Sequence, residues 1–181
     1  MLKDMPKEQL YEFSRQAVPC VGFNTRRATR LITQYYDKAL APAGIRSTQY
    51  SLLSLLSMMG EAPMQEVAYV LAMDRTTLTR NLNPLLRAGL VKVKVGSDRR
   101  SRPLTLTPKG KSTLEKALPY WQKAQSRIVN EIGTEQWDLM MRGLHQISMI
   151  VEEEMSLRGG RHLHQHASAG VARRSNLMSK V

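Results

Sequence analysis

The residues best suited to chemistry in this sequence are cations that could bind a polyanion. Ten lysines and arginines fall between Arg75 and Lys111, and the same stretch holds one acidic residue, Asp98. The whole chain of 181 residues carries 27 Lys and Arg against 15 Asp and Glu, a formal net charge of +12. An acidic cluster, Glu152–Glu154, lies far away in the sequence. This asymmetry indicates one basic face, which is typical of nucleic-acid-binding proteins.

A helix predicted from Arg75 to Ala88 would present part of this charge. Asp74 is a suitable N-cap and Gly89 a suitable stop. A leucine stripe at helical spacing faces the core: Leu78, Leu82, Leu85 and Leu86. The other faces carry the candidate DNA contacts: Arg75, Thr76, Thr77, Thr79, Arg80, Asn83 and Arg87. Hydroxyl, amide and guanidinium groups read base edges in the major groove and bind phosphates, so the helix is interpreted as a recognition helix rather than an ordinary amphipathic surface helix.

A β-hairpin is predicted to follow this helix. Val91, Val93 and Val95 alternate with polar residues, and Leu104 and Leu106 alternate again after a polar tip. The tip carries four charged residues: Asp98, Arg99, Arg100 and Arg102. An arginine on such a wing is attracted by the negative potential of a narrow minor groove, whereas Asp98 is expected to hold a neighbouring arginine through an ion pair. The alternative is a plain exposed basic turn.

The remaining elements are predicted to be helical. Before the recognition helix, we expect a short helix near 7–15 and a longer one over 20–41. A third helix should be capped by Ser47 or Thr48 and end at Gly60, and a short fourth one should carry Pro63 in its first turn. Two long helices should follow the hairpin, the second of them capped by Thr134. The fold class is therefore mainly α with a small β-hairpin wing. We expect helices at 1–45, a winged helix-turn-helix at 46–110, helices at 111–158 and a disordered tail at 159–181.

This pattern resembles the MarR family of bacterial regulators. The run MDRTTLTRNLNPLLRAGLVKVKVGSDRRSRPLTLTPKG (Met73–Gly110) is similar to the family signature, in which Asp98 and Arg100 match the paired wing residues. Leu106, Thr107 and Gly110 match its closing motif, and ATRLITQYYDKALAPAGIRSTQYSLL is similar to the helices before it. The resemblance covers about residues 20–155. Two departures are Ala72 in the helix-turn-helix turn, where glycine is common, and Pro84 inside the recognition helix, where a kink is expected.

The resemblance implies a repressor that binds double-stranded DNA at a pseudo-palindromic operator. It implies that residues 1–45 and 111–158 are dimerisation helices, which agrees with apolar stripes too large for one small domain to bury. It also implies release by a small aromatic or lipophilic effector, for which Tyr35, Met58 and Trp121 could line a pocket. Core packing is the alternative role for these three side chains.

Two other modes of action stay open at this stage. Cys20, the one cysteine in the chain, could sense oxidants if it is exposed and Arg26 and Arg27 favour its thiolate, as in peroxide-sensing relatives. The chain could instead be an architectural protein that coats DNA without sequence preference.

Other classes of function are not expected. The sequence shows no phosphate loop, nucleophile pair or metal-ligand cluster, so neither an enzyme nor a cofactor is predicted. The alternating His162, His164 and His166 lack an acidic or cysteine partner and are not expected to bind a metal. With no signal-peptide pattern and no apolar run of membrane-spanning length, the protein is expected in the cytoplasm.

Overall fold

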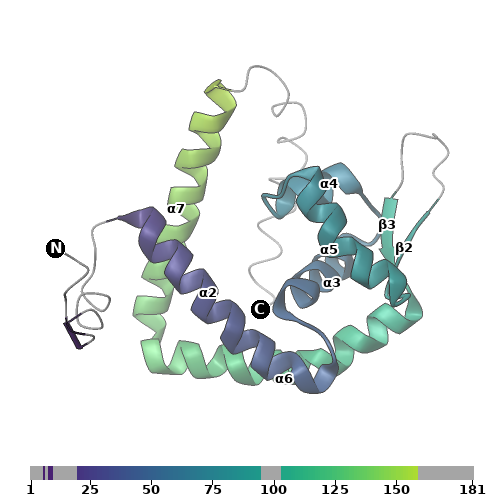
Figure 1. Cartoon of the computed structure of the whole chain (residues 1–181), viewed down its shortest axis with the longest axis horizontal. Helices are drawn as coiled ribbons and strands as arrows, with labels where there is room; N and C mark the ends of the chain where they lie inside the picture. Colours follow the sequence, from purple (N-terminus) through teal and green to yellow (C-terminus); the bar gives the residue numbers. More distant parts are fainter. Residues whose placement is uncertain (1–5, 7, 10–19, 95–102, 159–181) are drawn as a thin grey trace. The chain divides into compact units, whose positions relative to one another are not determined.

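The computed structural model describes residues 6, 8–9, 20–94 and 103–158 of the chain (Figure 1). The helix expected near 7–15, the wing tip and the tail from residue 159 therefore lie wholly or mostly outside the described residues. The elements are α2 (Val21–Leu40), the 3-10 turn η1 (Ala41–Ala43), α3 (Ser47–Met59), β1 (Ala62–Pro63), α4 (Met64–Val70), α5 (Arg75–Arg87), β2 (Val91–Val93), β3 (Pro103–Leu106), α6 (Pro108–Ile132) and α7 (Thr134–Arg158). The mainly helical fold with a small antiparallel sheet is confirmed.

The sheet has three strands in the order β1-β3-β2, where the sequence predicted a two-stranded hairpin. β2 pairs with β3 as expected, with Val91 opposite Leu106. The additional strand β1 pairs with the other edge of β3 and places Ala62 opposite Leu104. The expectation that Pro63 lies in the first turn of a helix is wrong. Pro63 has an extended ψ of 141° and immediately precedes α4, because it belongs to β1, where it lies opposite Pro103 of β3.

The core of the winged domain joins α3, α5 and the sheet. The side chains that are at most 2 % exposed are mainly leucines from these elements: Leu52, Leu53, Leu56, Leu78, Leu82, Leu85 and Leu104. The predicted leucine stripe of α5 is thus confirmed, with Leu86 partly buried beside it. Burying one leucine side chain stabilises a fold by about 1.5–3 kcal/mol relative to exposure. This packing fixes the inner face of α5 and so determines which side chains point outward.

Local backbone geometry explains where the helices begin and end. Asp74 caps α5 as predicted, since its carboxylate accepts a hydrogen bond from the Thr77 amide at 2.8 Å. Gly89, which follows α5, has a φ of +69°, and glycine adopts this conformation without strain. Ala72, in the turn between α4 and α5, has a φ of +50° and is the one described non-glycine residue with a positive φ.

Two predicted caps are wrong. Ser47 is the first helical residue of α3 rather than its N-cap, because its amide and hydroxyl both donate to Asp37 Oδ1 of α2 at 2.7 Å. Thr134 is likewise the first residue of α7. The Gly133 carbonyl accepts the first helical hydrogen bond, from the Trp137 amide at 2.9 Å, and Gly133 has a φ of +84°. In both places a neighbouring residue takes the cap position that the sequence assigned to a hydroxyl residue.

The chain divides into two compact units, residues 1–127 and 128–181. Within the first unit, α2 is tied to α6 by the hydroxyl of Tyr35, which donates to the Ala124 carbonyl at 3.3 Å, and by the hydroxyl of Tyr36, which donates to Gln125 Oε1. In the second unit, α7 carries many exposed apolar side chains: Leu139, Met140, Met141, Leu144, Met149, Ile150, Val151 and Met155. No helix among the described residues is long and apolar enough to cross a membrane.

Candidate nucleic-acid interface and an adjoining cavity

The outward face of α5 is polar and free of acidic residues. Four residues on that face, Thr76, Arg80, Asn83 and Arg87, are exposed as the helical spacing predicted. Arg75, at the first position of α5, is also exposed, whereas Thr77 is half-buried because it participates in the cap. The Thr79 hydroxyl donates to the Arg75 carbonyl at 2.7 Å, which leaves its methyl group and an oxygen lone pair toward solvent. Two guanidinium groups and an amide are therefore the strongest hydrogen-bonding groups of this face.

Asp74 is the one acidic residue at the N-terminal end of α5, and its carboxylate caps the helix. Hydrogen bonds from the Thr77 hydroxyl, at 2.7 Å, and from the Thr77 amide lower the pKa of the Asp74 carboxyl below its usual 3.8. A carboxylate at a helix N-terminus also interacts favourably with the helix dipole. The capping geometry therefore keeps a negative charge at the start of α5.

Helix α5 continues through Pro84 to Arg87. Pro84 has no amide hydrogen, so the Arg80 carbonyl lacks its usual helical donor. The Ala88 amide still donates to the Pro84 carbonyl at 3.0 Å, so the helix is closed after the proline. Asn83 and Arg87 consequently stay on the same outward face as Arg80.

The base of the wing is described although its tip is not. Lys94, which follows β2, forms an exposed ion pair with Glu61, which precedes β1. This pair joins the two outer strands of the sheet across β3. The predicted tip residues Asp98, Arg99, Arg100 and Arg102 lie outside the described residues.

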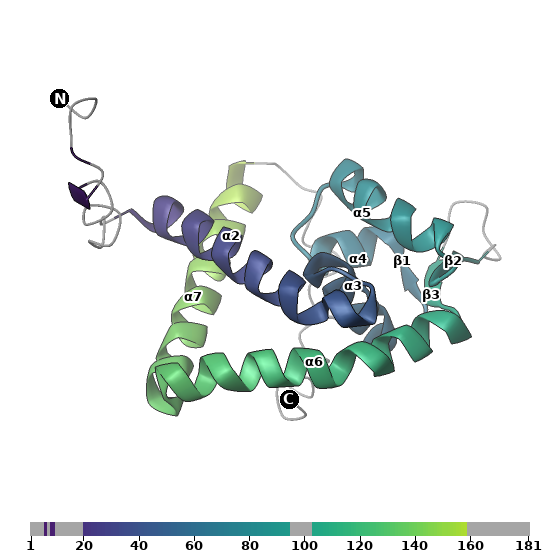
Figure 2. The same cartoon turned by 60° about the horizontal axis from the view of Figure 1, so that its bottom comes forward.

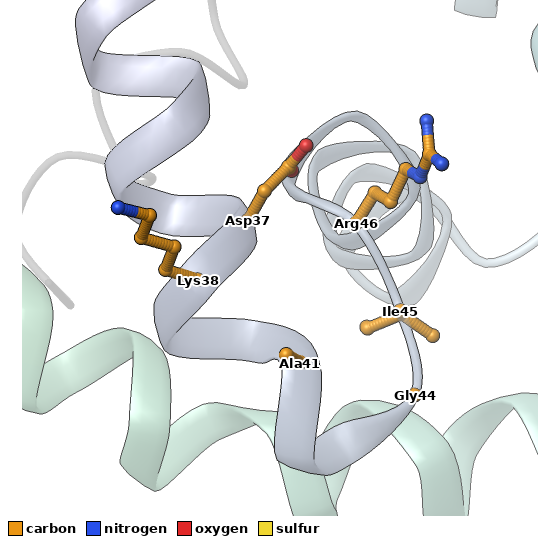
Figure 3. Close-up of a pocket in the computed structure, with 6 residues that line it drawn as sticks. All are labelled: Asp37, Lys38, Ala41, Gly44, Ile45 and Arg46. Atoms are coloured by element: carbon orange, nitrogen blue, oxygen red, sulfur yellow. The ribbon is translucent and has the colours of Figure 1, made fainter.

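Two hollows lie near the junction of α2 and α3. The larger, about 560 Å³, is lined by Asp37, Lys38, Ala41, Gly44, Ile45 and Arg46. Figure 3 shows Lys38 pointing away from Asp37 and Arg46, so the charged groups do not converge on one point. Its lining residues include no aromatic side chain that could stack on an aromatic ligand.

The smaller hollow, about 280 Å³, is better suited to an aromatic ring. Its lining comes from α2, α3 and α6: Ile32, Thr33, Tyr36, Leu40, Ser47, Thr48, Tyr50, Ser51 and Trp121. Burial raises the pKa of the Tyr36 hydroxyl, with a further contribution from Tyr35, and burial also raises the pKa of Tyr50. Both phenols are therefore neutral at physiological pH. We call this aromatic, hydroxyl-bearing and uncharged hollow the α2–α3–α6 cavity.

The structure places the three predicted effector-binding residues differently. Trp121 lines the α2–α3–α6 cavity, but Tyr35 and Met58 do not. Tyr35 packs edge-on against Tyr36, with ring centroids 5.6 Å apart, and Met58 is 55 % exposed at the end of α3. Sequence reasoning missed Tyr36 and Tyr50. The pair Tyr35 and Tyr36 is adjacent in sequence, so only the tertiary structure determines which of the two rings faces the cavity.

Cys20 lies at the N-cap position of α2 as a free, exposed thiol. Its carbonyl accepts hydrogen bonds from the amide and the side chain of Asn24, both at 3.1 Å. No group of three His, Cys, Asp or Glu side chains within the described ranges is placed to hold a metal ion.

Comparison with known proteins supports this description. The sequence matches no protein-family model. An uncharacterised HTH-type transcriptional regulator of Bacillus subtilis, YwoH, is 29 % identical over 109 residues, which cover 60 % of this chain and 80 % of that protein.

Solved structures extend the match over most of the chain. The transcriptional regulator MosR of M. tuberculosis, in complex with DNA, is 38 % identical, with a TM-score of 0.69 over 74 % of this chain and 97 % of that one. The repressor CouR, bound to a DNA duplex, is 26 % identical, with a TM-score of 0.66 over 80 % of this chain and 99 % of that one. A MarR-family regulator from Rhodococcus is 25 % identical, with a TM-score of 0.62 over 70 % and 91 %.

The fold and the outward face of α5 define a winged helix-turn-helix DNA-binding regulator of transcription. The chain belongs to the MarR family.

Proposed function

We propose that this regulator is a homodimeric, sequence-specific repressor that a small aromatic ligand releases from its operator. The observation that carries the DNA-binding part is the outward face of α5, where Arg80 and Asn83 are exposed on a helix whose inner face is fixed by buried leucines. Arginine binds guanine and asparagine binds adenine through paired hydrogen bonds in the major groove. Arg75, Thr76, Thr77 and Thr79 supply further contacts to bases and phosphates. On the wing, the proposed minor-groove contacts are Arg99, Arg100 and Arg102, and Asp98 is proposed to hold a neighbouring arginine by an ion pair.

The proposed dimer rests on apolar surface. Side chains on α7 such as Met149, Ile150 and Met155 are 50–66 % exposed, as is Leu31 on α2 at 52 %. Large apolar side chains exposed together along one helix, as on α7, indicate a protein–protein contact. A second copy of the chain is the proposed occupant. Two recognition helices related by a twofold axis read two half-sites, so the operator is expected to be pseudo-palindromic.

The proposed ligand site is the α2–α3–α6 cavity. CouR is also known in complex with p-coumaroyl-CoA, a ligand that carries an aromatic ring. In the present chain, the volume of about 280 Å³ and the stacked Tyr50 and Trp121 suit a single-ring aromatic compound. Ser47, Thr48 and Ser51 line the same cavity, and no hydrogen bond of the described structure occupies the Thr48 hydroxyl. The Ser47 and Ser51 hydroxyls already donate to Asp37 Oδ1 and to the Ser47 carbonyl, so toward a ligand they can only accept. A ring with a hydrogen-bonding substituent is therefore proposed in preference to a plain hydrocarbon.

DNA recognition is tested by comparing two arginine variants on an operator that the wild-type protein selects from a randomised duplex pool. Arg80→Ala should weaken operator binding by about 1–3 kcal/mol and relax the preference at one base pair. Arg142→Ala, which removes an exposed arginine of α7, should bind the operator like wild type. Equal affinities for wild type and Arg80→Ala, with both proteins folded, would contradict the proposed role of α5.

A thiol-based input is the second candidate, because Cys20 is exposed. Oxidation of this thiol would then replace the ligand as the signal that releases DNA. The two inputs make opposite predictions for a Cys20 variant, which are given in the Discussion.

A further inference from the structure

The C-terminal end of the recognition helix is bound by two residues at the start of α6. Three successive carbonyls follow α5, those of Ala88, Gly89 and Leu90. Lys109 Nζ donates to the Ala88 carbonyl at 2.9 Å, and the Thr107 hydroxyl donates to the Gly89 carbonyl at 2.6 Å. The Thr107 amide donates to the Leu90 carbonyl at 3.1 Å. Figure 2 shows the start of α6 beside β2 and this end of α5.

The same threonine also begins α6. Its hydroxyl accepts a hydrogen bond from the Gly110 amide at 3.0 Å, and its carbonyl accepts one from the Lys111 amide at 3.0 Å. A hydroxyl can donate one hydrogen bond and accept others, so Thr107 serves two elements at once. The N-cap of α6 and the anchor of the α5 C-terminus are therefore one side chain.

Gly110 shows how closely the two segments approach. A Cβ atom at this position would lie 2.0 Å from the Leu90 carbonyl oxygen, a backbone atom that cannot move aside as a flexible side chain can. The backbone of α6 therefore packs directly on the connection between α5 and β2. This close approach keeps Thr107 and Lys109 within hydrogen-bond distance of the three carbonyls.

We propose that Thr107 and Lys109 are positioning residues that set the orientation of the recognition helix on DNA. The inference rests on the proposed function, since it assigns these residues to the same DNA-binding event. They act through backbone carbonyls of Ala88 and Gly89, and Lys109 does so although it is an exposed cation near the proposed interface. Without these bonds, α5 remains packed by its leucines, but its orientation relative to the DNA major groove is no longer fixed.

A positioning residue and a phosphate contact predict different binding data. Misorientation of α5 weakens binding to the operator, where base contacts matter, more than binding to random duplex DNA, where phosphates dominate. Loss of one phosphate contact weakens binding to both duplexes equally and lowers the salt dependence by about one unit.

Four variants separate the two roles. Thr107→Val should lower the ratio of operator to random-duplex affinity by about fivefold or more, which is the low end of the loss of a base contact. Thr107→Ser, which restores the hydroxyl, should recover that ratio. Lys109→Met should lower the ratio with an unchanged salt slope. Lys111→Met, which removes an exposed cation on the same turn, should leave the ratio at its wild-type value.

Controls address folding and the proposed function itself. The thermal unfolding of each variant is followed by circular dichroism, and Lys109→Met provides the test if Thr107→Val does not fold. An unchanged ratio in folded Thr107→Val and Lys109→Met would overturn the inference, as would a reduced salt slope with an unchanged ratio in Lys109→Met. If the wild-type protein selects no operator, the proposed function fails before any variant is compared.

Discussion

The rings of Tyr50 and Trp121 stack with their centroids 5.6 Å apart and their planes inclined by 18°. Tyr50 belongs to α3 of the winged domain and Trp121 to α6, so the stack joins the DNA-binding domain to a long helix at the wall of the α2–α3–α6 cavity. Both residues line this cavity, so a ligand bound there is expected to contact at least one of the two rings.

This contact makes Trp121 an optical reporter of ligand binding. The chain has two tryptophans, so Trp137→Phe leaves Trp121 as the one tryptophan. In that variant, single-ring aromatic compounds that release DNA should change the tryptophan emission with saturable dependence on concentration. Trp121→Phe, which leaves Trp137, should show no change. Emission changes confined to Trp137 would place the ligand elsewhere.

Ala72→Gly should stabilise the protein. Ala72 has a φ of +50°, and a left-handed conformation costs a residue with a Cβ atom about 1–2 kcal/mol. Glycine removes that strain but gains entropy in the unfolded chain, so the net gain should be at most about 1 kcal/mol. Urea unfolding measures it. Ala28→Gly, at an exposed position inside α2, should instead destabilise the protein by about 0.5–1 kcal/mol. A loss of stability in Ala72→Gly would show that the turn is not strained.

The Asp74 cap should make stability depend on pH in a defined direction. The pKa of Asp74 is lowered in the folded state from the unfolded value of 3.8, so the cap contributes fully above that value and is lost as the pH falls through the folded pKa. Asp74→Ala should therefore be less stable than wild type at about pH 6, and this difference should shrink below about pH 4. Asp74→Asn, which keeps an N-cap acceptor that does not titrate, should remain more stable than Asp74→Ala throughout. A constant difference between wild type and Asp74→Ala across this range would contradict the capping role.

Local sequence signals predicted most of the described elements because each depends on neighbouring residues. Helical spacing of Leu78, Leu82 and Leu85 defined the buried face of α5, and Asp74 defined its start. β1 was missed because a two-residue strand shows no alternation, and its pairing with Leu104 arises only in the folded chain. The Ser47 cap was wrong because Asp37, ten residues earlier, takes both of its donors.

Of the candidate site, the face of α5 could be predicted from the sequence and the cavity could not. Exposure on the outward face of α5 followed from its period, whereas the α2–α3–α6 cavity depends on contacts between segments about 70–90 residues apart and could not be located from spacing. Thr107 was recognised as part of a motif, but its hydrogen bonds to the carbonyls after α5 required the folded structure.

A Cys20→Ser variant distinguishes the two proposed inputs. If a ligand is the signal, Cys20→Ser and wild type should both bind the operator, respond equally to organic hydroperoxide and be released by the same aromatic compound. We favour this result, because the aromatic cavity is built into the fold whereas Cys20 is a single exposed thiol at a helix end. Release from DNA is measured by electrophoretic mobility shift. If hydroperoxide releases the wild-type protein but not Cys20→Ser, the thiol is the sensor instead.

Recognition of a specific duplex sequence by a dimer of this chain can be tested directly. The most direct test is selection of binding sites from a randomised duplex pool, followed by affinity measurements on the selected and random duplexes at one fixed salt concentration. We expect an inverted repeat with half-sites centred about 10 base pairs apart, or a multiple of that spacing. The affinity for the selected site should be at least about a thousandfold above that for random DNA. Equal affinity for both duplexes, with no enriched sequence, would contradict the account and identify a protein that coats DNA without sequence preference.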